Sequence, residues 1–246
     1  MSARCEVLRP GCVEYETAWK LQARLAEDIA AGRRPPALLL LEHPHTYTFG
    51  RRGQAGNLLW TAEELARRGV RVHWVDRGGD VTYHGPGQLV GYPLIPLSTA
   101  GLHAGPDGQP RLPQADYVGY LRRLEESLIL ALARLGVRAG REPGMTGVWV
   151  RPAETPNAGD PRPAKLAAIG VKVDARGITR HGFALNLDTD PLYWQGIIGC
   201  GLQGYRTANL ADLLAPLPSP GAVMEAVCAA FGEVFGYEMV DGNIEG

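Results

Sequence analysis

One cysteine and one lysine, each in a segment of small residues, are the candidates for chemistry in this sequence. Cys200 stands between Gly199 and Gly201, so its thiol has room for a substrate on both sides. A thiolate in that setting could act as a nucleophile. Lys165 enters a strand-like run of small apolar residues, where it is either held in a partly buried site or extends to solvent. Taken alone, each residue also fits an inert thiol or a solvated amine.

Two further segments combine glycine with polar side chains. The stretch 77–88, RGGDVTYHGPGQ, contains four glycines, which let the backbone turn tightly and approach a bound molecule. Arg77 and His84 supply polar groups there. The same residues also fit a structural turn in which Arg77 is solvated and His84 caps a strand. The stretch 181–186, HGFALN, follows Lys165 across a predicted hairpin.

The remaining cysteines carry no sign of chemistry. Cys5, Cys12 and Cys228 form no C-x-x-C pair, and the sequence has no Cys and His cluster at zinc-ligand spacing. Cys228 belongs to the apolar stripe of a predicted helix. We therefore expect three free, inert thiols and no metal site.

Hydrophobic periodicity predicts the elements that must position these residues. Apolar residues at helical spacing end at glycines, which are typical just after a helix. Short apolar runs between turn residues indicate strands, and Pro93 and Pro96 suggest that one strand lies at an edge or ends irregularly. We predict an α/β (α+β) fold with a mixed central β-sheet flanked by helices. The predicted helices are 14–31, 61–69, 114–135, 209–214 and 221–235, and the predicted strands are 37–42, 70–76, 89–97, 147–150, 166–173 and 178–187.

Composition and charge exclude several classes of protein. With 246 residues, 45% of them hydrophobic, the chain has the size of one large globular domain. Its 25 basic and 26 acidic residues give a net charge of −1, so no basic field favours nucleic acid. No apolar run approaches the roughly 20 residues that span a bilayer, and no export signal is visible. We expect a cytoplasmic protein of one domain, 1–246, with a mobile loop at 98–113 and a surface insertion at 151–163.

Four motifs, in this order, make the sequence similar to the lipoyl(octanoyl) transferase family. They are R-G-G-x-x-T-x-H-G-P-G-Q at 77–88, K-x-A-A-I-G at 165–170, H-G-x-A-L-N at 181–186 and C-G at 200–201. The resemblance covers the chain from about residue 43 to about residue 210. One departure is Gly199, where the family usually has proline. The resemblance implies the fold of biotin and lipoate protein ligases, a mixed sheet flanked by helices.

The resemblance also implies an activity. Members of the family move an octanoyl group from acyl carrier protein to a lysine of lipoyl domains, through a cysteine thioester. The matching positions make Cys200 the nucleophile and Lys165 the group that lowers the pKa of its thiol. Lys165 must matter mostly as a proton shuttle, because lowering a thiol pKa from about 8.5 to about 7 speeds its reaction only about 3-fold. The residues implied to bind substrate, around a slot for the acyl chain, are Arg77, Gly78, Gly79, Asp80, Val81, Thr82, Tyr83, His84, Ala168, Ile169, Gly170, Gly182, Phe183 and Ala184.

The same resemblance implies the partners. No cofactor is expected, because the acyl donor is carried on the phosphopantetheine of acyl carrier protein and the thioester chemistry needs no nucleotide. The acceptors would be lipoyl domains of 2-oxoacid dehydrogenase complexes and the glycine cleavage H protein. The carrier is acidic, and the arginine pairs 33–34, 51–52 and 67–68 could face it or simply be solvated.

Other functions stay open at this point. An ATP-dependent lipoate or biotin protein ligase shares the expected fold and a glycine-rich Arg-to-His segment, but it activates its acid as an adenylate and has no use for Cys200. A non-enzymatic protein that binds an acylated or lipoylated partner would need neither Cys200 nor Lys165. A papain-like hydrolase fits less well, since the nearest candidate partner by motif is a lysine rather than a histidine.

Overall fold

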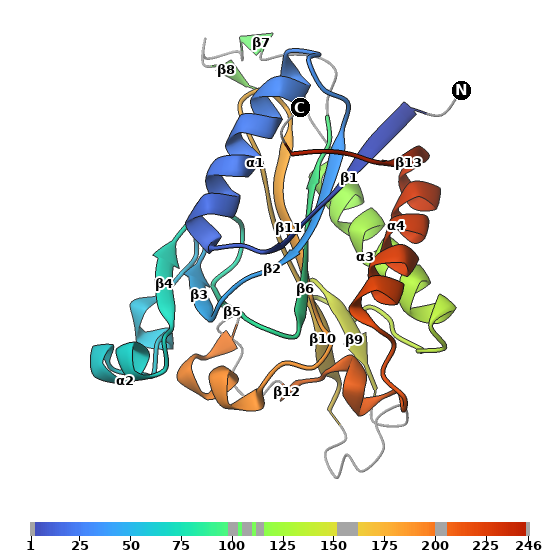
Figure 1. Ribbon diagram of the computed structural model, residues 1–246. Coiled ribbons are helices and arrows are strands. Elements are labelled where there is room, and N and C mark those ends of the chain that lie inside the picture. The colour runs from blue at the N-terminus through green and yellow to red at the C-terminus, as the bar shows by residue number, and fades with distance from the viewer. Residues whose placement is uncertain are drawn as a thin grey trace.

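The computed structural model describes residues 3–97, 103–104, 110–111, 116–151, 162–199 and 206–244. In this part of the chain eight strands form one mixed sheet, with the order β12-β10-β11-β6-β2-β1-β13 and with β9 also paired to β10 (Figure 1). The mixed sheet predicted from the sequence is confirmed. The strands are β1 (Ala3–Cys12), β2 (Ala37–Glu42), β6 (Gln88–Leu94), β9 (Val148–Val150), β10 (Ala164–Val173), β11 (Thr179–Asn186), β12 (Arg206–Thr207) and β13 (Tyr237–Asp241).

Helices cover both faces of the sheet. Helix α1 (Tyr15–Ala30) lies on one face, and α3 (Tyr117–Arg134) and α4 (Pro220–Phe235) pack together on the other (Figure 1). The leucines of β2 show why its sequence is a continuous apolar run. Leu38 and Leu40 pack in the core with α3 and α4, whereas Leu39 and Leu41 pack in the core with α1. Because side chains alternate along a strand, a strand buried on both faces needs apolar residues at every position.

A second, smaller sheet carries the first motif. It consists of β3 (Thr46–Phe49), β4 (Arg71–Trp74) and β5 (Val81–His84), in the order β4-β3-β5. Helix α2 (Ala62–Arg67) precedes β4 and begins with the predicted capping box, in which the side chains of Thr61 and Glu64 bond reciprocally. β3 and β5 are not predicted from the sequence, and β5 lies within the glycine-rich motif, which indicates a turn.

Strand β6 differs from its prediction in its position within the sheet. β6 lies between β2 and β11, so the expectation of an edge strand is wrong and the irregular end is correct. Pairing with β11 ends at Gly91, opposite Phe183, and Pro93 is paired only with β2. Proline has no amide hydrogen to donate to a second partner strand, and it is tolerated at position 93 because β6 is no longer paired with β11 there.

The ends of the predicted elements also shift. Helix α3 begins at Tyr117 because Asp116 caps it, accepting from the Gly119 amide over 2.6 Å. The helix predicted at 209–214 is only a short 3-10 turn, Leu210–Asp212. The predicted loop 98–113 and insertion 151–163 lie almost entirely outside the described residues. Among the described helices none is long and apolar enough to cross a membrane.

Candidate active site

A cavity of about 610 Å³ lies beside β10 and β11, where the loop 77–80 approaches them. The loop is held there by the Gly78 amide, which donates to the Val171 carbonyl of β10 over 2.9 Å. Three of the four motifs therefore meet at one cavity. The predicted substrate-binding residues that line it are Arg77, Gly78, Gly79, Asp80, Thr82, His84, Ala168, Ile169, Gly170, Gly182, Phe183 and Ala184.

Two predicted substrate-binding residues lie on the other side of β5. Side chains alternate along the strand, so Thr82 and His84 face the cavity, whereas Val81 and Tyr83 face the apolar core of the small sheet around Tyr47. A contact between Val81 or Tyr83 and a substrate would therefore be made by backbone atoms.

Arg77 holds the glycine loop against β3. Its guanidinium donates to the Thr48 carbonyl over 2.5 Å, to the Thr48 hydroxyl over 2.9 Å and to the Gly78 carbonyl over 2.8 Å. The approach is close, since a Cβ on Gly50 would lie 2.5 Å from the Gly79 carbonyl oxygen, where only glycine fits. Arg77 is 7% exposed, so the alternative of a solvated side chain is wrong.

His84 begins a chain of hydrogen bonds that joins two motifs. Its Nδ1 lies 2.8 Å from Oε1 of Gln88, and Nε2 of Gln88 donates to Oδ1 of Asn186 over 2.9 Å. Asn186 in turn donates to the Ala208 carbonyl over 3.1 Å. Burial lowers the pKa of His84 well below its ordinary value, so the ring is neutral at pH 7 and Nδ1 is the donor to Gln88. Gln88 and Asn186 therefore brace the cavity wall without lining it.

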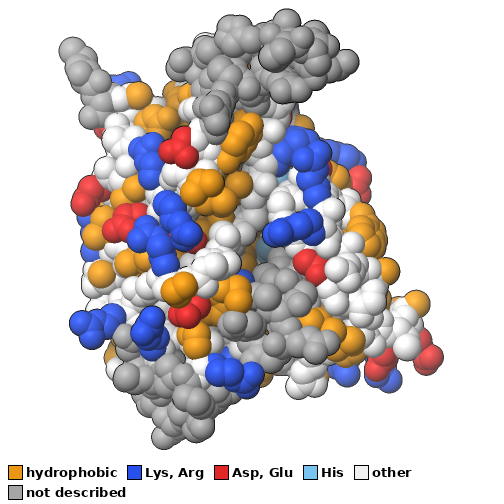
Figure 2. All heavy atoms as spheres, turned by 180° about the vertical axis from the view of Figure 1, so that it is seen from behind, with side chains coloured by type: hydrophobic (Ala, Val, Ile, Leu, Met, Phe, Trp, Pro, Cys, Tyr) orange, Lys and Arg blue, Asp and Glu red, His pale blue; other side chains and the backbone are white. Residues whose placement is uncertain are grey.

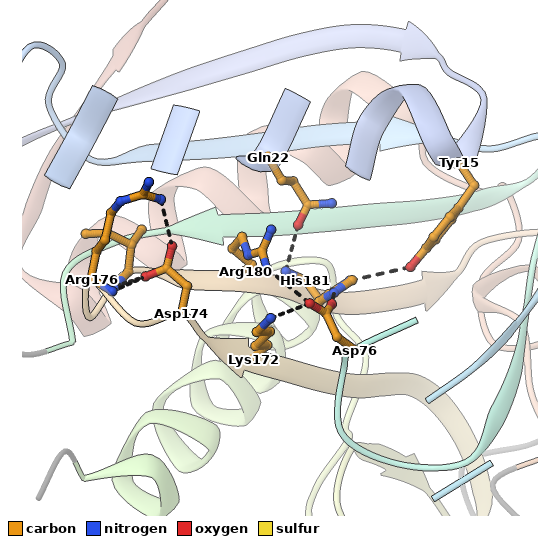
Figure 3. Close-up of polar contacts among 9 residues, drawn as sticks. Tyr15, Gln22, Asp76, Lys172, Asp174, Arg176, Arg180 and His181 are labelled. Carbon is orange, nitrogen blue, oxygen red and sulfur yellow. Dashed lines mark hydrogen bonds and ion pairs between the residues drawn. The ribbon is translucent and has the colours of Figure 1, made fainter. Parts of the chain in front are cut away.

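Asp76, directly before the first motif, contacts three side chains of the β10–β11 hairpin (Figure 3). Its carboxylate lies 2.8 Å from Nε2 of His181 and 3.1 Å from NH2 of Arg180, and it forms an ion pair with Lys172. Burial raises the pKa of Asp76, but the hydrogen bonds from His181 and Lys172 outweigh it and hold that pKa well below its usual range. We call these four residues the Asp76 network. Asp76 is not predicted from the sequence, although its place beside Arg77 is a signal that could have indicated it.

His181 has a backbone conformation that is rare within a strand. Its φ is +57°, in the left-handed region that costs a non-glycine residue about 1–2 kcal/mol. Helix α1 helps to hold it: the His181 amide donates to Oε1 of Gln22 over 2.7 Å, and its Nδ1 lies 3.4 Å from the Tyr15 hydroxyl (Figure 3). Asp76 holds the other ring nitrogen. His181 and Tyr15 both line the cavity, and strain held by surrounding contacts is typical of functional sites.

Lys165 lies near the opposite end of β10 from His181 and also lines the cavity. Its ammonium lies 4.7 Å from the ring centre of Trp149 in β9, a cation–π contact. Thr207 of β12 pairs with Lys165 on the other side, and the Ala208 amide donates to the Lys165 carbonyl over 3.0 Å. The residue as a whole is partly buried.

Cys200 lies outside the described residues, but the chain on both sides of it is anchored. Before it, the Ile198 amide donates to the Asn57 carbonyl over 2.9 Å. After it, Arg206 and Thr207 pair with β10 at Ala164 and Lys165. The first described residues after Cys200 thus lie beside the predicted proton shuttle. The roles of both residues stay predictions.

The other three cysteines have the environment of inert thiols. Cys5 and Cys228 are buried, and burial raises the pKa of Cys5 to about 12 and that of Cys228 to about 11. Cys12 is exposed, and its pKa is raised by partial desolvation and by the nearby acidic residues. All three are therefore protonated at pH 7. Within the described ranges, no group of three or more His, Cys, Asp or Glu residues could hold a metal ion.

Comparison with known proteins first defines the class of catalytic domain. A family model described as lipoyl protein ligase A/B catalytic domain matches residues 14–232. A solved lipoate-protein ligase A bound with ATP superposes with a TM-score of 0.63 at 19% identity, covering 98% of this chain and 89% of that chain. A bipartite lipoate protein ligase from Thermoplasma acidophilum gives 0.63 at 18% identity, with 98% and 87% covered. At these identities the structures show a shared fold.

Curated relatives then narrow the assignment. An octanoyltransferase from Chloroflexus aurantiacus is 42% identical over 228 residues, covering 93% of this chain and 92% of the relative. An octanoyltransferase from Salinispora arenicola is 44% identical over 223 residues, covering 90% of each. The chain belongs to the lipoyl protein ligase A/B catalytic domain family and, within it, to the octanoyltransferases. The resemblance drawn from the four motifs is confirmed.

Proposed function

We propose that this chain transfers an octanoyl group from the phosphopantetheine thioester of acyl carrier protein to a lysine of lipoyl domains, through a thioester on Cys200. The observation that carries the proposal is the meeting of three motifs at one cavity that Lys165 also lines. Support comes from the curated relatives, which are octanoyltransferases that match 90% or more of the chain. The reaction would be the first step of endogenous protein lipoylation.

Two half-reactions follow from the proposed roles. In the first, the Cys200 thiolate attacks the donor carbonyl, a new C–S bond forms, and the pantetheine sulfur leaves with a proton from Lys165. In the second, the acceptor amine attacks the acyl-enzyme, Lys165 takes the proton that the amine loses, and Cys200 leaves as a thiolate. Protons balance over the cycle, and no nucleotide is consumed. Such general acid–base help typically contributes about 100-fold or more to the rate.

The cavity wall suits an unbranched acyl chain. Ala168, Gly170 and Gly182 present little or no side chain to the cavity, while Ile169 and Phe183 add apolar surface. Walls made of backbone leave a narrow slot, which is the purpose that we assign to these small residues. Burial of about seven methylene and methyl groups would stabilise the bound octanoyl group by about 5 kcal/mol, at about 0.8 kcal/mol each.

The arginine pair 51–52 is the best candidate to contact the acidic carrier. The pair 33–34 is already engaged by Asp28 and Glu6, and one member of the pair 67–68 is stacked on a tryptophan. By contrast, the side chains at 51–52 are exposed and form no hydrogen bond or ion pair with any described residue, and Arg52 lines the cavity. Figure 2 shows basic side chains on both sides of the hollow in this face. Attraction between the arginines at the rim of the cavity and acidic groups of the carrier would orient the donor as it approaches.

The acceptors that we propose are lipoyl domains of 2-oxoacid dehydrogenase complexes and the glycine cleavage H protein. Members of this fold act on such domains: the bipartite ligase from Thermoplasma acidophilum forms a lipoylation system with an E2 lipoyl domain. A lysine on the acceptor would enter the same cavity end as the donor thioester, after the carrier has left.

Incubation of the full chain with octanoyl carrier protein and a lipoyl domain, without nucleotide, tests the proposal. We expect the lipoyl domain to gain the mass of one octanoyl group. An ATP-dependent ligase would instead require free octanoate and ATP, and would give no product from the carrier. A protein that only binds acylated partners would give no product under either condition.

A further inference from the structure

A buried carboxylate connects α3 to the Lys165 end of the cavity. Glu125 is 0% exposed and accepts three hydrogen bonds. Its Oε1 accepts from the Gly147 amide over 3.0 Å, and its Oε2 accepts from Arg122 over 2.6 Å and from Arg141 over 3.0 Å. A buried carboxylate is costly unless it is paired. The two arginines neutralise it, and the remaining bond goes to the backbone of the segment 140–147.

The segment 140–147 forms the wall of the cavity next to Lys165. Residues 144–146 line the cavity together with Lys165. A Cβ placed on Gly147 would lie 3.6 Å from Cε of Lys165 and 2.5 Å from the Ala167 carbonyl oxygen. Gly147 is therefore packed directly against the strand and the side chain of the lysine.

Glu125 contacts this segment near both of its ends. Arg141 lies at the start and Gly147 at the finish, and both bond to the same carboxylate. The base of the segment is closed by two backbone hydrogen bonds of 2.8 Å between Gly140 and Trp149. Between those points the wall is loop, and Glu125 is the side chain of α3 with a described bond near each of its ends.

We infer that Glu125 is a positioning residue, which fixes the segment 140–147 against Lys165 and so keeps that lysine within reach of the reacting atoms. The inference rests on the proposed function, in which Lys165 moves protons for Cys200 and the acceptor amine. Proton transfer needs hydrogen-bond distance, and a misplacement of about 1 Å can cost about 100-fold in rate. Leu121, one helical turn before Glu125, lines the same cavity, so this side of α3 is directed at the site.

Glu125→Gln separates the bond to the segment from the bonds to the arginines. The amide has a single oxygen, and two guanidinium groups attract it more strongly than one neutral N–H does. The oxygen therefore turns to the arginines, and the Gly147 amide loses its acceptor. Glu126→Gln is the matched control: it makes the same charge change on the next residue of α3, Glu126 accepts from Arg141 over 2.6 Å, and it has no described bond to Gly147.

Two readouts on the full chain test the inference. By hydrogen exchange, Glu125→Gln should lose amide protection at 140–147, whereas Glu126→Gln should keep it. Turnover in octanoyl transfer to a lipoyl domain should fall about 10-fold or more in Glu125→Gln, with the KM for octanoyl carrier protein within about 2-fold of the unsubstituted chain. Arg141→Met, which leaves the Gly147 bond in place, is a second variant if Glu125→Gln does not fold, and we expect a smaller loss of both quantities.

Unchanged protection at 140–147 in Glu125→Gln would overturn the inference, and so would a loosened segment with unchanged turnover. Equal losses of turnover in Glu125→Gln and Glu126→Gln would also overturn it, because the bond to Gly147 would then be irrelevant. A failure of the proposed function shows itself differently. The unsubstituted chain would then transfer no octanoyl group at all, while hydrogen exchange would still report on the contact between Glu125 and the segment.

Discussion

The two ends of the cavity differ in how their polar groups are held. At the His181 end, Asp76 contacts three side chains of one hairpin, and α1 adds contacts from Gln22 and Tyr15. At the Lys165 end, the wall next to the lysine is a loop, the segment 140–147, of which residues 144–146 line the cavity.

This difference separates the frame of the site from its chemistry. The Asp76 network ties the chain directly before the loop 77–80 to β10 and β11. In the proposed reaction, the Lys165 end would admit a carrier-bound thioester and then a lysine of a different protein. A wall made of a loop allows one partner to replace the other, provided that contacts such as the one from Glu125 hold the loop in place.

The largest effect on octanoyl transfer is expected at the Lys165 end of the cavity, from Lys165→Arg. Arginine keeps a positive charge, but it cannot accept a proton because its pKa exceeds about 12. Transfer to the lipoyl domain should fall about 100-fold or more, while Cys200 should still react with a small alkylating agent at a near-normal rate. Both rates are measured on the same preparation. Near-normal transfer by this variant would leave Lys165 as an electrostatic neighbour rather than a shuttle.

A glycine pair on the facing strands tests where the acyl chain runs. Gly170 and Gly182 are cross-strand partners, but a Cβ on Gly182 would lie 2.2 Å from the Gly91 carbonyl oxygen, whereas one on Gly170 would lie 3.0 Å from the Gly78 carbonyl oxygen. Gly182→Ala should therefore lower the free energy of unfolding by about 2.5 kcal/mol, as measured by urea titration.

Gly170→Ala serves as its counterpart, because its Cβ faces the loop of the first motif. It should leave most of the stability in place and weaken octanoyl transfer more than transfer of a short acyl group. Equal losses for both chain lengths would show that the acyl chain does not pass Gly170. A Gly182→Ala variant of unchanged stability would show that β11 and β6 can separate more easily than the close contact between Gly182 and Gly91 indicates.

At the His181 end of the cavity, Asp76→Asn should lower the free energy of unfolding at pH 7 by about 2 kcal/mol, because it weakens hydrogen bonds to charged partners. The pKa of Asp76 is lower in the folded chain than its unfolded value of about 3.9. Its contribution is thus fully present above that value and lost as the pH falls toward the folded pKa. The difference between the two chains should be largest above about pH 5 and shrink below about pH 4. A difference that is the same at pH 7 and pH 3 would contradict this assignment.

The smallest effect is expected from Tyr15→Phe. The Tyr15 hydroxyl lies 3.4 Å from Nδ1 of His181, which is long for a hydrogen bond between these groups. The ring itself is retained, so we expect a loss of only about 0.5 kcal/mol in stability and near-normal transfer. A loss as large as that of Asp76→Asn would mean that the tyrosine, rather than the carboxylate, determines the position of His181.

Much of the main sheet and its helices could be predicted from the sequence, because each has a local signal. The spacing of the leucines in β2 and of the apolar residues along α3 predicts that these side chains are buried. β1 and β13 could not be predicted, since their pairing joins the two ends of the chain and leaves no local pattern. β5 could not be predicted because its four residues lie inside a motif that indicates a turn.

The candidate site divides in the same way. Most of the residues that line the cavity lie in the motifs, so the family resemblance indicates them. The residues that hold those motifs in place are single polar side chains on other elements: Asp76, Gln22 and Glu125. Gln22 and Glu125 resemble ordinary solvent-facing residues of a helix in the sequence, and only the folded contacts distinguish them, whereas Asp76 has the one signal of standing beside the first motif.

Trapping of the acyl-enzyme tests whether Cys200 carries the acyl group. The full chain is incubated with octanoyl carrier protein but no acceptor, and its intact mass and peptides are then measured. We expect one octanoyl group, located on Cys200, and none on Cys200→Ser. The buried thiols Cys5 and Cys228 should stay unmodified, because burial keeps them protonated. An adduct on another residue, or transfer to a lipoyl domain by Cys200→Ser at the normal rate, would show that Cys200 is not the nucleophile.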